Sequence, residues 1–280
     1  MTDAALALSR DLAATDSDHA ALLAAYQHGV ALCTIVGIEG SFSRRLGAQM
    51  AVLSDGSTIG SLADGCLEKQ LASDARDASV PVVKRYGSGS PVIDFRLPCG
   101  GGLDILVDPA PDRAACRKAA SLLERRKPAM LPLPENFGLA QRQYSPALKI
   151  AAFGEGPELD ALAAIGRAAG IDISTRTELS AVPDLDRWTA IVLLFHDHDR
   201  ERDILAQAVQ SDAFYIGAQG GENARNARIM QLLADGVPEE QIARIRGPIG
   251  SVPGCRTPTA LALSILSEVV GHYEGLKSHR

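Results

Sequence analysis

The chain has 280 residues, 46% of them hydrophobic and only 4% aromatic, with 28 Lys and Arg against 34 Asp and Glu. A length prior of about 100–200 residues per domain favours two domains, each large enough to bury its own core. The net charge of -6 argues against nucleic acid as the main partner, because binding to a phosphate backbone needs a basic surface.

The excess of acidic residues falls mainly after residue 147, which makes the first half the better home for an anionic ligand. The five cysteines are odd in number and widely scattered, unlike a secreted disulfide framework. The first residues lack a basic segment followed by an apolar core, and no apolar run approaches the ~20 residues of a membrane span. We therefore expect a cytoplasmic protein without a membrane segment.

Helical spacing of Ala and Leu predicts a helix over residues 3–28 that ends at Gly29. A β-branched run predicts a strand at 31–38. Further along, Asp55-Gly56 predicts the turn of a hairpin. The further elements expected up to residue 126 are the hairpin strands 49–53 and 58–62, a helix at 67–78, strands at 81–86, 92–96 and 103–107, and a helix at 112–126.

Four prolines between residues 127 and 146 indicate edge strands followed by a linker, so we expect domains at 1–146 and 147–280. Beyond the linker, strands and helices alternate, which predicts a parallel sheet with helices on its faces. The strands are expected at 148–153, 171–174, 190–195 and 213–216, and the helices at 157–169, 199–210, 223–235 and 257–274. The fold class is therefore α/β, an N-terminal mixed α+β domain followed by a C-terminal Rossmann-like domain.

Two cysteines in the first domain are flanked by glycine, in the segments Gly65-Cys66 and Cys99-Gly100-Gly101. Glycine leaves room beside the sulfur, so a bulky ligand or a metal could approach the thiol and the neighbouring N–H groups. The alternative is structural, because a free cysteine often serves as a small buried apolar side chain.

A glycine turn, Gly154-Glu155-Gly156, lies between a predicted strand and a predicted helix, where glycines let a phosphate reach a helix N-terminus. It departs from the dinucleotide fingerprint, because Leu159 replaces the third glycine and Pro157 removes one N–H donor. NAD(P) binding and a Rossmann-like scaffold without a dinucleotide both remain open.

Three further loops carry polar or cysteine residues. His196-Asp197-His198 follows a buried-looking strand, where it would form either a polar pocket wall or part of a metal site, although no closed set of ligands is nearby. The loop 217–223 could present N–H groups to an anion or be a plain turn. The Gly- and Pro-rich segment 247–258 contains Cys255, either a third ligand thiol or an incidental one.

Several motifs together resemble those of a known family. In the first half they are Gly40-Ser41-Phe42-Ser43-Arg44, Gly65-Cys66-Leu67-Glu68 and Cys99-Gly100-Gly101, and in the second half His196-Asp197-His198, Tyr215-Ile216-Gly217, Pro248-Ile249-Gly250 and Arg256-Thr257-Pro258. With these motifs the chain resembles the xanthine dehydrogenase accessory proteins, which are also found beside aerobic carbon monoxide dehydrogenases. It departs from the family pattern at Ser43, at 220–222 and at 251–255.

The resemblance implies a chaperone, with no catalytic residue assigned, that binds the molybdenum cofactor (molybdopterin). It would protect the cofactor, support its sulfuration and deliver it to an apo xanthine dehydrogenase-type enzyme. A cysteine desulfurase is a candidate partner, and we expect a homodimer. The candidate cofactor-binding residues are Arg44, Arg45, Gly65, Cys66, Cys99, Gly100, Gly101, Gly154, Gly156 and His196, with Cys66 and Cys99 as the thiolates nearest the metal.

Two alternatives remain at this point. One is an NAD(P)-dependent oxidoreductase that uses the turn at Gly154 and Gly156 together with His196. The other is a scaffold that binds only the partner dehydrogenase. Nicotinamide dinucleotide affinity would favour the first, and association with the dehydrogenase without cofactor would favour the second.

Overall fold

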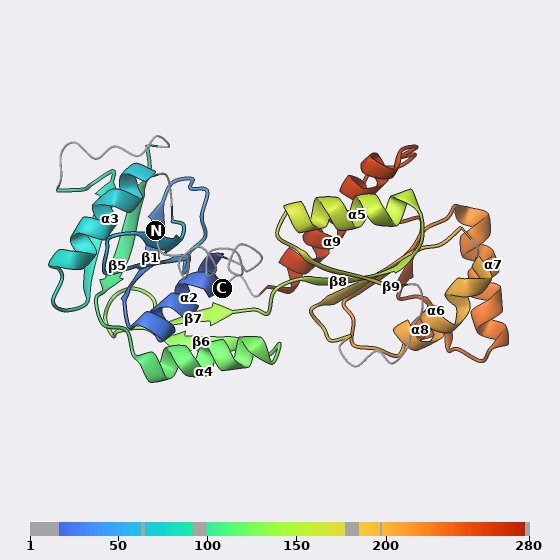
Figure 1. Cartoon of the computed structure of the whole chain (residues 1–280), viewed down its shortest axis with the longest axis horizontal. Coiled ribbons are helices and arrows are strands. Elements are labelled where there is room, and N and C mark those ends of the chain that lie inside the picture. The colour runs from blue at the N-terminus through green and yellow to red at the C-terminus, as the bar shows by residue number, and fades with distance from the viewer. Residues whose placement is uncertain (1–16, 63–64, 92–99, 177–184, 197, 278–280) are drawn as a thin grey trace. The chain divides into compact units, whose positions relative to one another are not determined.

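The computed structural model describes residues 17–62, 65–91, 100–176, 185–196 and 198–277, with only the backbone described at 65, 66, 198 and 199. Residue contacts divide the chain into two compact units, Met1–Pro146 (unit 1) and Ala147–Arg280 (unit 2) (Figure 1). Unit 1 contains an antiparallel sheet and unit 2 a parallel one, as the sequence predicts for an α/β protein of this kind.

The main sheet of unit 1 has five strands in the order β3-β2-β1-β5-β4, and every pair is antiparallel. The strands are β1 (Ala31–Glu39), β2 (Gln49–Val52), β3 (Thr58–Gly60), β4 (Val82–Gly87) and β5 (Gly102–Asp108). The predicted hairpin of β2 and β3 is confirmed. The first six residues of β1 are all buried, because this central strand is covered on both faces.

Helices cover both faces of this sheet. They are α2 (Ser17–His28), α3 (Gly65–Asp77) and α4 (Arg113–Glu124). The side chains Cys33 and Ile35 of β1 pack in one core with Leu67 and Leu71 of α3, whereas Leu32 packs in a second core with residues of α2 and α4. This alternation follows from the two-residue period of a strand.

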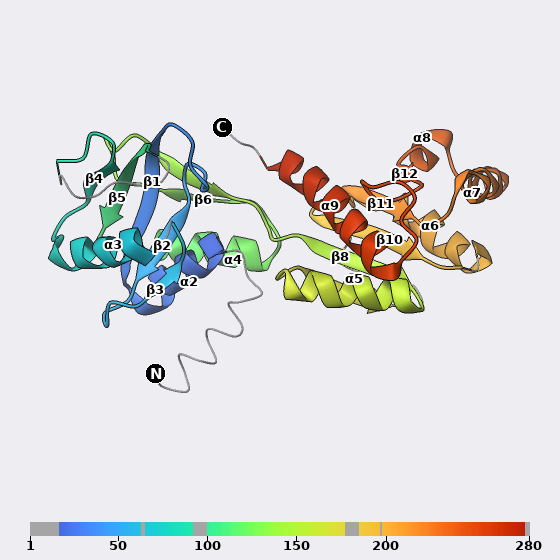
Figure 2. The same ribbon diagram turned by 90° about the horizontal axis from the view of Figure 1, so that it is seen from above.

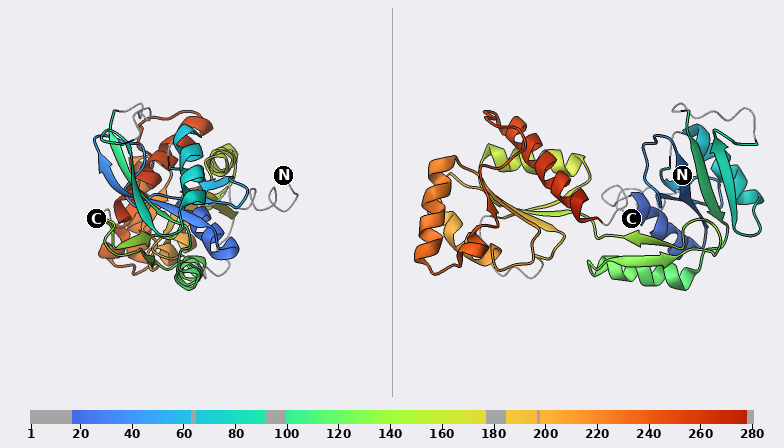
Figure 3. Two further views of the ribbon diagram at one scale, coloured as in Figure 1. Left: turned by 90° about the vertical axis from the view of Figure 1, so that its left-hand side faces the viewer. Right: turned by 180° about the vertical axis from the view of Figure 1, so that it is seen from behind.

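A small second sheet completes unit 1. Its strands are β6 (Ala129–Pro132) and β7 (Gln141–Tyr144), which pair antiparallel. The view from behind in Figure 3 shows them beside α4, and Ala129, Leu131 and Tyr144 belong to the same core as α2 and α4. The predicted edge strands in the proline-rich segment are therefore confirmed.

Unit 2 is built on a five-stranded parallel sheet in the order β12-β11-β10-β8-β9 (Figure 2). Its strands are β8 (Lys149–Gly154), β9 (Asp172–Arg176), β10 (Thr189–Leu194), β11 (Tyr215–Ala218) and β12 (Ile245–Arg246). Its helices are α5 (Pro157–Ala168), the 3₁₀ turn η1 (His198–Glu201), α6 (Arg202–Ala208), α7 (Glu222–Ala234), α8 (Glu239–Ile242) and α9 (Pro258–Leu276).

In unit 2 the helices lie on opposite faces of the sheet: α5 and α9 on one face, α6 and α8 on the other (Figure 1). The chain runs from β8 through α5 to β9 at one edge and then returns to β10 on the other side of β8. The carboxyl ends of the neighbouring strands β8 and β10 therefore form the topological switch point, where open α/β sheets place their ligands.

Some predicted boundaries were wrong. The helix expected from residue 67 begins at Gly65, so the backbone of Cys66 lies in a helical turn and not in a loop. The helix expected from 199 begins as a 3₁₀ turn, and α8 and β12 were missed because they are too short to show a period. The strand expected at 92–96 and the helix before residue 17 lie outside the described residues. No described helix is both long and apolar enough to cross a bilayer.

Candidate functional site

The loop between β1 and β2, residues 40–47, forms the centre of a candidate site in unit 1. Its C-terminal end is a tight turn in which the Ala48 N–H donates to the Arg45 carbonyl over 3.1 Å. Gly47 has a positive φ of 79°, which a glycine adopts without strain in such a turn, and its N–H donates to the Ile35 carbonyl over 2.8 Å. The backbone at Arg45 is therefore fixed to β1.

Arg44 connects this loop to the segment before α3. Its Nη2 donates to the hydroxyl of Ser61 over 3.1 Å, in an exposed position. Ser61 precedes Gly65, the first residue of α3, by four positions, and the Leu62 N–H donates to the Glu68 carboxylate over 3.2 Å. The loop 40–47 thus lies close to the start of the helix that carries Cys66.

The other end of the loop lies against the second glycine segment. A Cβ atom built on Gly40 would lie 3.5 Å from the Cα of Gly101, so the two backbones approach closely. Gly100 has open space around its Cα and leads into β5. Cys99 lies outside the described residues, and the described part of the chain contains no group of three or more His, Cys, Asp or Glu able to hold a metal ion.

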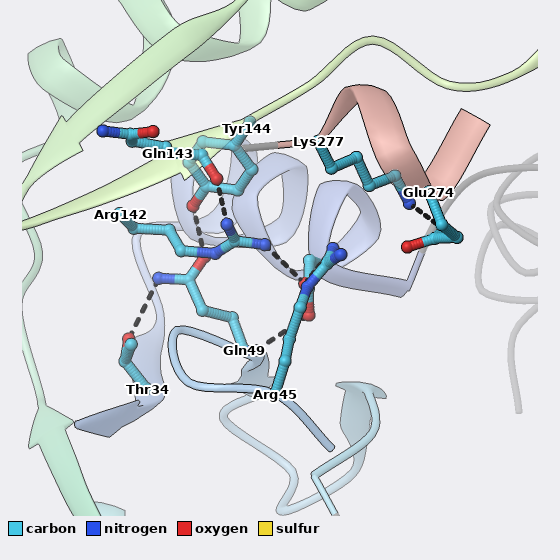
Figure 4. A network of polar contacts seen from close by, with 9 residues as sticks. Thr34, Arg45, Gln49, Arg142, Gln143, Tyr144, Glu274 and Lys277 are labelled. Atoms are coloured by element: carbon cyan, nitrogen blue, oxygen red, sulfur yellow. Dashed lines mark hydrogen bonds and ion pairs between the residues drawn. The ribbon is translucent and has the colours of Figure 1, made fainter. Parts of the chain in front are cut away.

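Arg45 takes part in a buried polar network (Figure 4). Its Nη2 lies 3.4 Å from Oδ2 of Asp18, which also accepts a 2.7 Å hydrogen bond from Arg142. The Gln49 N–H donates to the other carboxylate oxygen of Asp18 over 2.8 Å. The network joins α2, β2 and β7 to the candidate loop. Neither Asp18 nor Arg142 belongs to a period or motif that would indicate this role from the sequence alone.

The cysteines whose side chains are described differ in their surroundings. Burial, reinforced by nearby carboxylates, raises the pKa of the Cys33 thiol to about 12 and that of Cys116 to about 11. Both are packing residues, because a protonated buried thiol is a poor nucleophile and a poor ligand. Cys255 is partly exposed and donates to the Val252 carbonyl over 3.3 Å.

In unit 2 the structure brings the three predicted residues to the switch point. Gly154 ends β8, and a Cβ atom there would lie 2.3 Å from the carbonyl oxygen of Leu194, so only glycine fits beside β10. Gly156 is the N-cap of α5. His196 follows β10, and its Nε2 lies 3.5 Å from the carboxylate of Glu158 in the first turn of α5.

The charges at this turn are not those of an ordinary pyrophosphate site. Glu155 pairs with Arg200 over 2.7 Å, and Glu158 lies at the helix N-terminus with His196. Carboxylates already occupy the electropositive end of α5, where a phosphate would otherwise bind. Sequence reasoning missed Glu158 and Arg200, although both lie within a few residues of the predicted ones.

A buried ion pair supports the loops at this edge. Arg228 of α7 donates from Nε and Nη2 to the Glu201 carboxylate over 2.9 and 2.7 Å, and its Nη2 also donates to the Gln219 carbonyl. The side chains of Arg228 and Glu201 are only 5% and 1% exposed. The pair ties η1 to α7 and to the loop after β11.

Comparison with known proteins places this fold and these motifs in one family. The model of the XdhC and CoxI family matches residues 23–87, and the model of the XdhC Rossmann domain matches residues 150–269. The molybdenum cofactor insertion chaperone PaoD of Escherichia coli (strain K12) is 33% identical over 266 residues, covering 86% of this chain and 82% of PaoD. The chain belongs to the XdhC and CoxI family. The resemblance read from the sequence is therefore confirmed.

Other matches extend the comparison. The uncharacterized protein YqeB of Escherichia coli (strain K12) is 24% identical to this family member over 245 residues, covering 86% of this chain but only 43% of YqeB. A crystal structure described as a xanthine dehydrogenase from Bacillus halodurans superimposes with a TM-score of 0.73 at 18% identity, covering 94% of this chain and 97% of the other. At that identity the match shows a shared fold.

Proposed function

We propose that this protein is a molybdenum cofactor chaperone that binds the cofactor in residues 1–146 and delivers it to an apo xanthine dehydrogenase-type enzyme. The observation that supports it most is the loop 40–47, which contacts Ser61 near the start of α3 at one point and Gly101 at another. The loop therefore contacts a residue shortly before α3 and the glycine that directly precedes β5. The name of PaoD, a molybdenum cofactor insertion chaperone, supports the same role.

The residues around the loop suit a pterin that carries a phosphate. Arg44 and Arg45 supply guanidinium groups that can bind phosphate oxygens in pairs, and the exposed backbone at Gly100 can donate an N–H group, whereas Gly101 is buried beside Gly40. Soft thiolates at Cys66 and Cys99 suit molybdenum. The backbone of Cys66 belongs to the first turn of α3.

The proposed role includes partners beyond the cofactor. The chaperone would support replacement of an oxo ligand of molybdenum by sulfide, with a cysteine desulfurase as the sulfur source, before transfer to the apo-enzyme. We further propose that it acts in the cytoplasm as a homodimer. Residues 147–280 would form the Rossmann-like domain of each protomer.

The primary experiment measures bound pterin. The full chain, purified from cells that make the molybdenum cofactor, should yield a fluorescent pterin after oxidation. Cys66→Ser and Cys99→Ser should each reduce pterin retention and activation of the apo-dehydrogenase, whereas Cys255→Ser, the control, should not. Absence of bound or bindable pterin would overturn the proposal, and full retention in both variants would make the two thiols structural.

A second candidate function uses unit 2. An NAD(P)-dependent oxidoreductase is favoured by one observation, the convergence of Gly154, Gly156 and His196 at the switch point. Arg176, at the end of β9, could bind the 2′-phosphate of NADP. Glu155 and Glu158 weigh against it. Tight binding of a nicotinamide dinucleotide in isothermal titration, together with no pterin affinity, would reverse the order of the two proposals.

A further inference from the structure

Arginine side chains gather at one edge of the parallel sheet in unit 2. The edge strand is β12, which follows α8 and pairs only with β11 among the described strands (Figure 2). A cleft of about 570 Å³ lies beside it, and its charged lining consists of Arg225, Arg244, Arg246 and Glu268. We call it the arginine cleft. Arg225 comes from α7 and Glu268 from α9, so elements distant in the sequence meet there.

Two arginines of this cleft keep their charge uncompensated. Arg225 and Arg246 are exposed, and neither forms an ion pair with any described residue. The guanidinium of Arg246 lies over the ring of Tyr215, 5.9 Å from its centroid. Glu268 accepts a hydrogen bond from the Gly250 N–H. Two guanidinium groups therefore line the cleft with donors to offer, in the half of the chain where acidic residues are in excess.

Arg244 has a different role, because it holds the start of β12 in place. Its terminal nitrogens donate to the carbonyls of Val209, Ser211 and Ala213 over 2.6, 2.9 and 2.8 Å. These carbonyls belong to the segment between α6 and β11. This wall of the cleft is thus fixed by the fold, so a ligand would not have to order it on binding.

A second cleft, of about 280 Å³, adjoins the first. Its lining is mainly aliphatic and comes from α7, α8 and β12, with Ile229, Leu233, Ile242, Ala243 and Ile245. We call it the aliphatic cleft. Arg225 and Gly247 line both clefts. Since a cavity of about 150 Å³ already holds benzene, the aliphatic cleft has room for an aromatic ring.

A buried donor lies where the two clefts meet. Arg228 lines the aliphatic cleft, and its Nε and Nη2 donate to Glu201 and Gln219, but no described residue accepts a hydrogen bond from its buried Nη1. A Cβ atom built on Gly247 would lie 3.7 Å from this Nη1. A buried N–H without an acceptor is costly, so an acceptor supplied from outside the chain would be stabilising here.

We propose that the two clefts together bind a small organic phosphate, with the phosphate in the arginine cleft and an aromatic or aliphatic group in the aliphatic cleft. A phosphate monoester has three terminal oxygens, enough for charge-assisted hydrogen bonds from both Arg225 and Arg246. Small-molecule sites occupy about 300–1,000 Å³, a range that fits the two clefts. The site shares no residue with the proposed cofactor site, so neither proposal depends on the other.

The test titrates the ¹⁵N-labelled full chain with phenyl phosphate and follows its backbone amides by NMR. The amides of Ile245, Arg246 and Gly247 should shift until the site is saturated. Inorganic phosphate lacks the ring, and benzoate lacks the third oxygen and the second charge. Each should bind at these amides at least about 10-fold more weakly than phenyl phosphate.

Substitutions separate the two parts of the site. Arg225→Gln and Arg246→Gln should each raise the dissociation constant of phenyl phosphate about 10-fold, as expected for the loss of one charge-assisted contact. Leu233→Ser should weaken the binding of phenyl phosphate but not of inorganic phosphate, because it changes only the aliphatic cleft. Arg167→Gln is the matched control: it removes the same charge from an exposed position of α5 that lines neither cleft.

Several results would overturn the proposal while leaving the chaperone proposal standing. Shifts confined to the loop 40–47 or to the turn at Gly154 and Gly156 would place the anion elsewhere. Wild-type affinity in both arginine variants would show that these guanidinium groups do not hold it. Equal affinity for benzoate or inorganic phosphate would exclude this class of ligand. If one arginine variant fails to fold, as thermal unfolding would show, the other decides together with Leu233→Ser.

Discussion

The buried ion pair of Arg228 and Glu201 allows a quantitative test of what stabilises the loops at the carboxyl ends of the strands in unit 2. Arg228→Met removes the guanidinium while keeping a side chain of similar length, so the Glu201 carboxylate, 1% exposed, loses both hydrogen bonds that it accepts from this residue. The Gln219 carbonyl in the loop after β11 loses a donor at the same time.

The expected cost is large because the charge left behind is buried. Removing one partner of a buried ion pair destabilises a protein by about 3–5 kcal/mol, most of it from the carboxylate that remains. With a urea m-value of about 2 kcal/mol/M for a domain of this size, the unfolding midpoint should fall by about 2 M. Adding Glu201→Gln to Arg228→Met also removes the buried negative charge, so most of the lost stability should be recovered.

Trp188 provides the assay, because it is the only tryptophan in the sequence and lies 4% exposed in the core of unit 2. Its fluorescence during urea titration reports the unfolding of this unit. Arg202→Ala is the matched control: it breaks an ion pair with Asp235 between α6 and the end of α7, but at an exposed position, where such pairs contribute little. If the urea midpoint of Arg228→Met equals that of Arg202→Ala, loss of the buried partner of Glu201 does not carry the expected cost.

Three further outcomes are expected. Gly154→Ala should destabilise unit 2 by about 3 kcal/mol in the same titration, because a methyl group has no room beside the backbone of β10; a loss below about 1 kcal/mol would contradict this. At pH 8 a maleimide should label Cys255 of the native protein but neither Cys33 nor Cys116, whose pKa values are raised by burial, until urea unfolds unit 1; mass spectrometry of the peptides decides. Burial raises the pKa of the Asp108 carboxyl in the folded protein above its value of about 3.9 in the unfolded chain, so the wild type loses stability as the pH rises through these two pKa values. Asp108→Asn should therefore increase Tm at pH 7 more than at pH 3. An equal increase at both pH values would exclude this cause.

Most of the fold could be predicted from the sequence, because the central strands of both sheets are apolar runs and the second half alternates strands with helices. Continuous apolar runs predicted the buried strands β1, β8 and β10, and the alternation of strands and helices predicted the parallel sheet. The start of α3 was misplaced because the glycine at residue 65, a poor helix former, was read as part of a loop. In the structure this residue begins the helix.

The candidate site was only partly predictable for a different reason. Local patterns indicated Arg44 and Arg45, which stand together in a glycine-flanked loop. Asp18 and Arg142 act on that loop from distant positions, and their pairing depends on how α2 and β7 pack, which no local period encodes. The same holds for Glu201 and Arg228.

The hydrogen bond between Asp18 and Arg142 spans 124 residues, and that between Gln49 and Tyr144 spans 95. A chain made from its N-terminus can form β1 through β5, and with them the contact of Gly47 to Ile35, before β7 exists, but the Asp18–Arg142 hydrogen bond can form only when nearly all of unit 1 has left the ribosome. Contacts of such sequence separation form late and slow folding, because the intervening chain must be ordered before they contribute. The buried polar network beside the loop is therefore complete only in a finished unit 1.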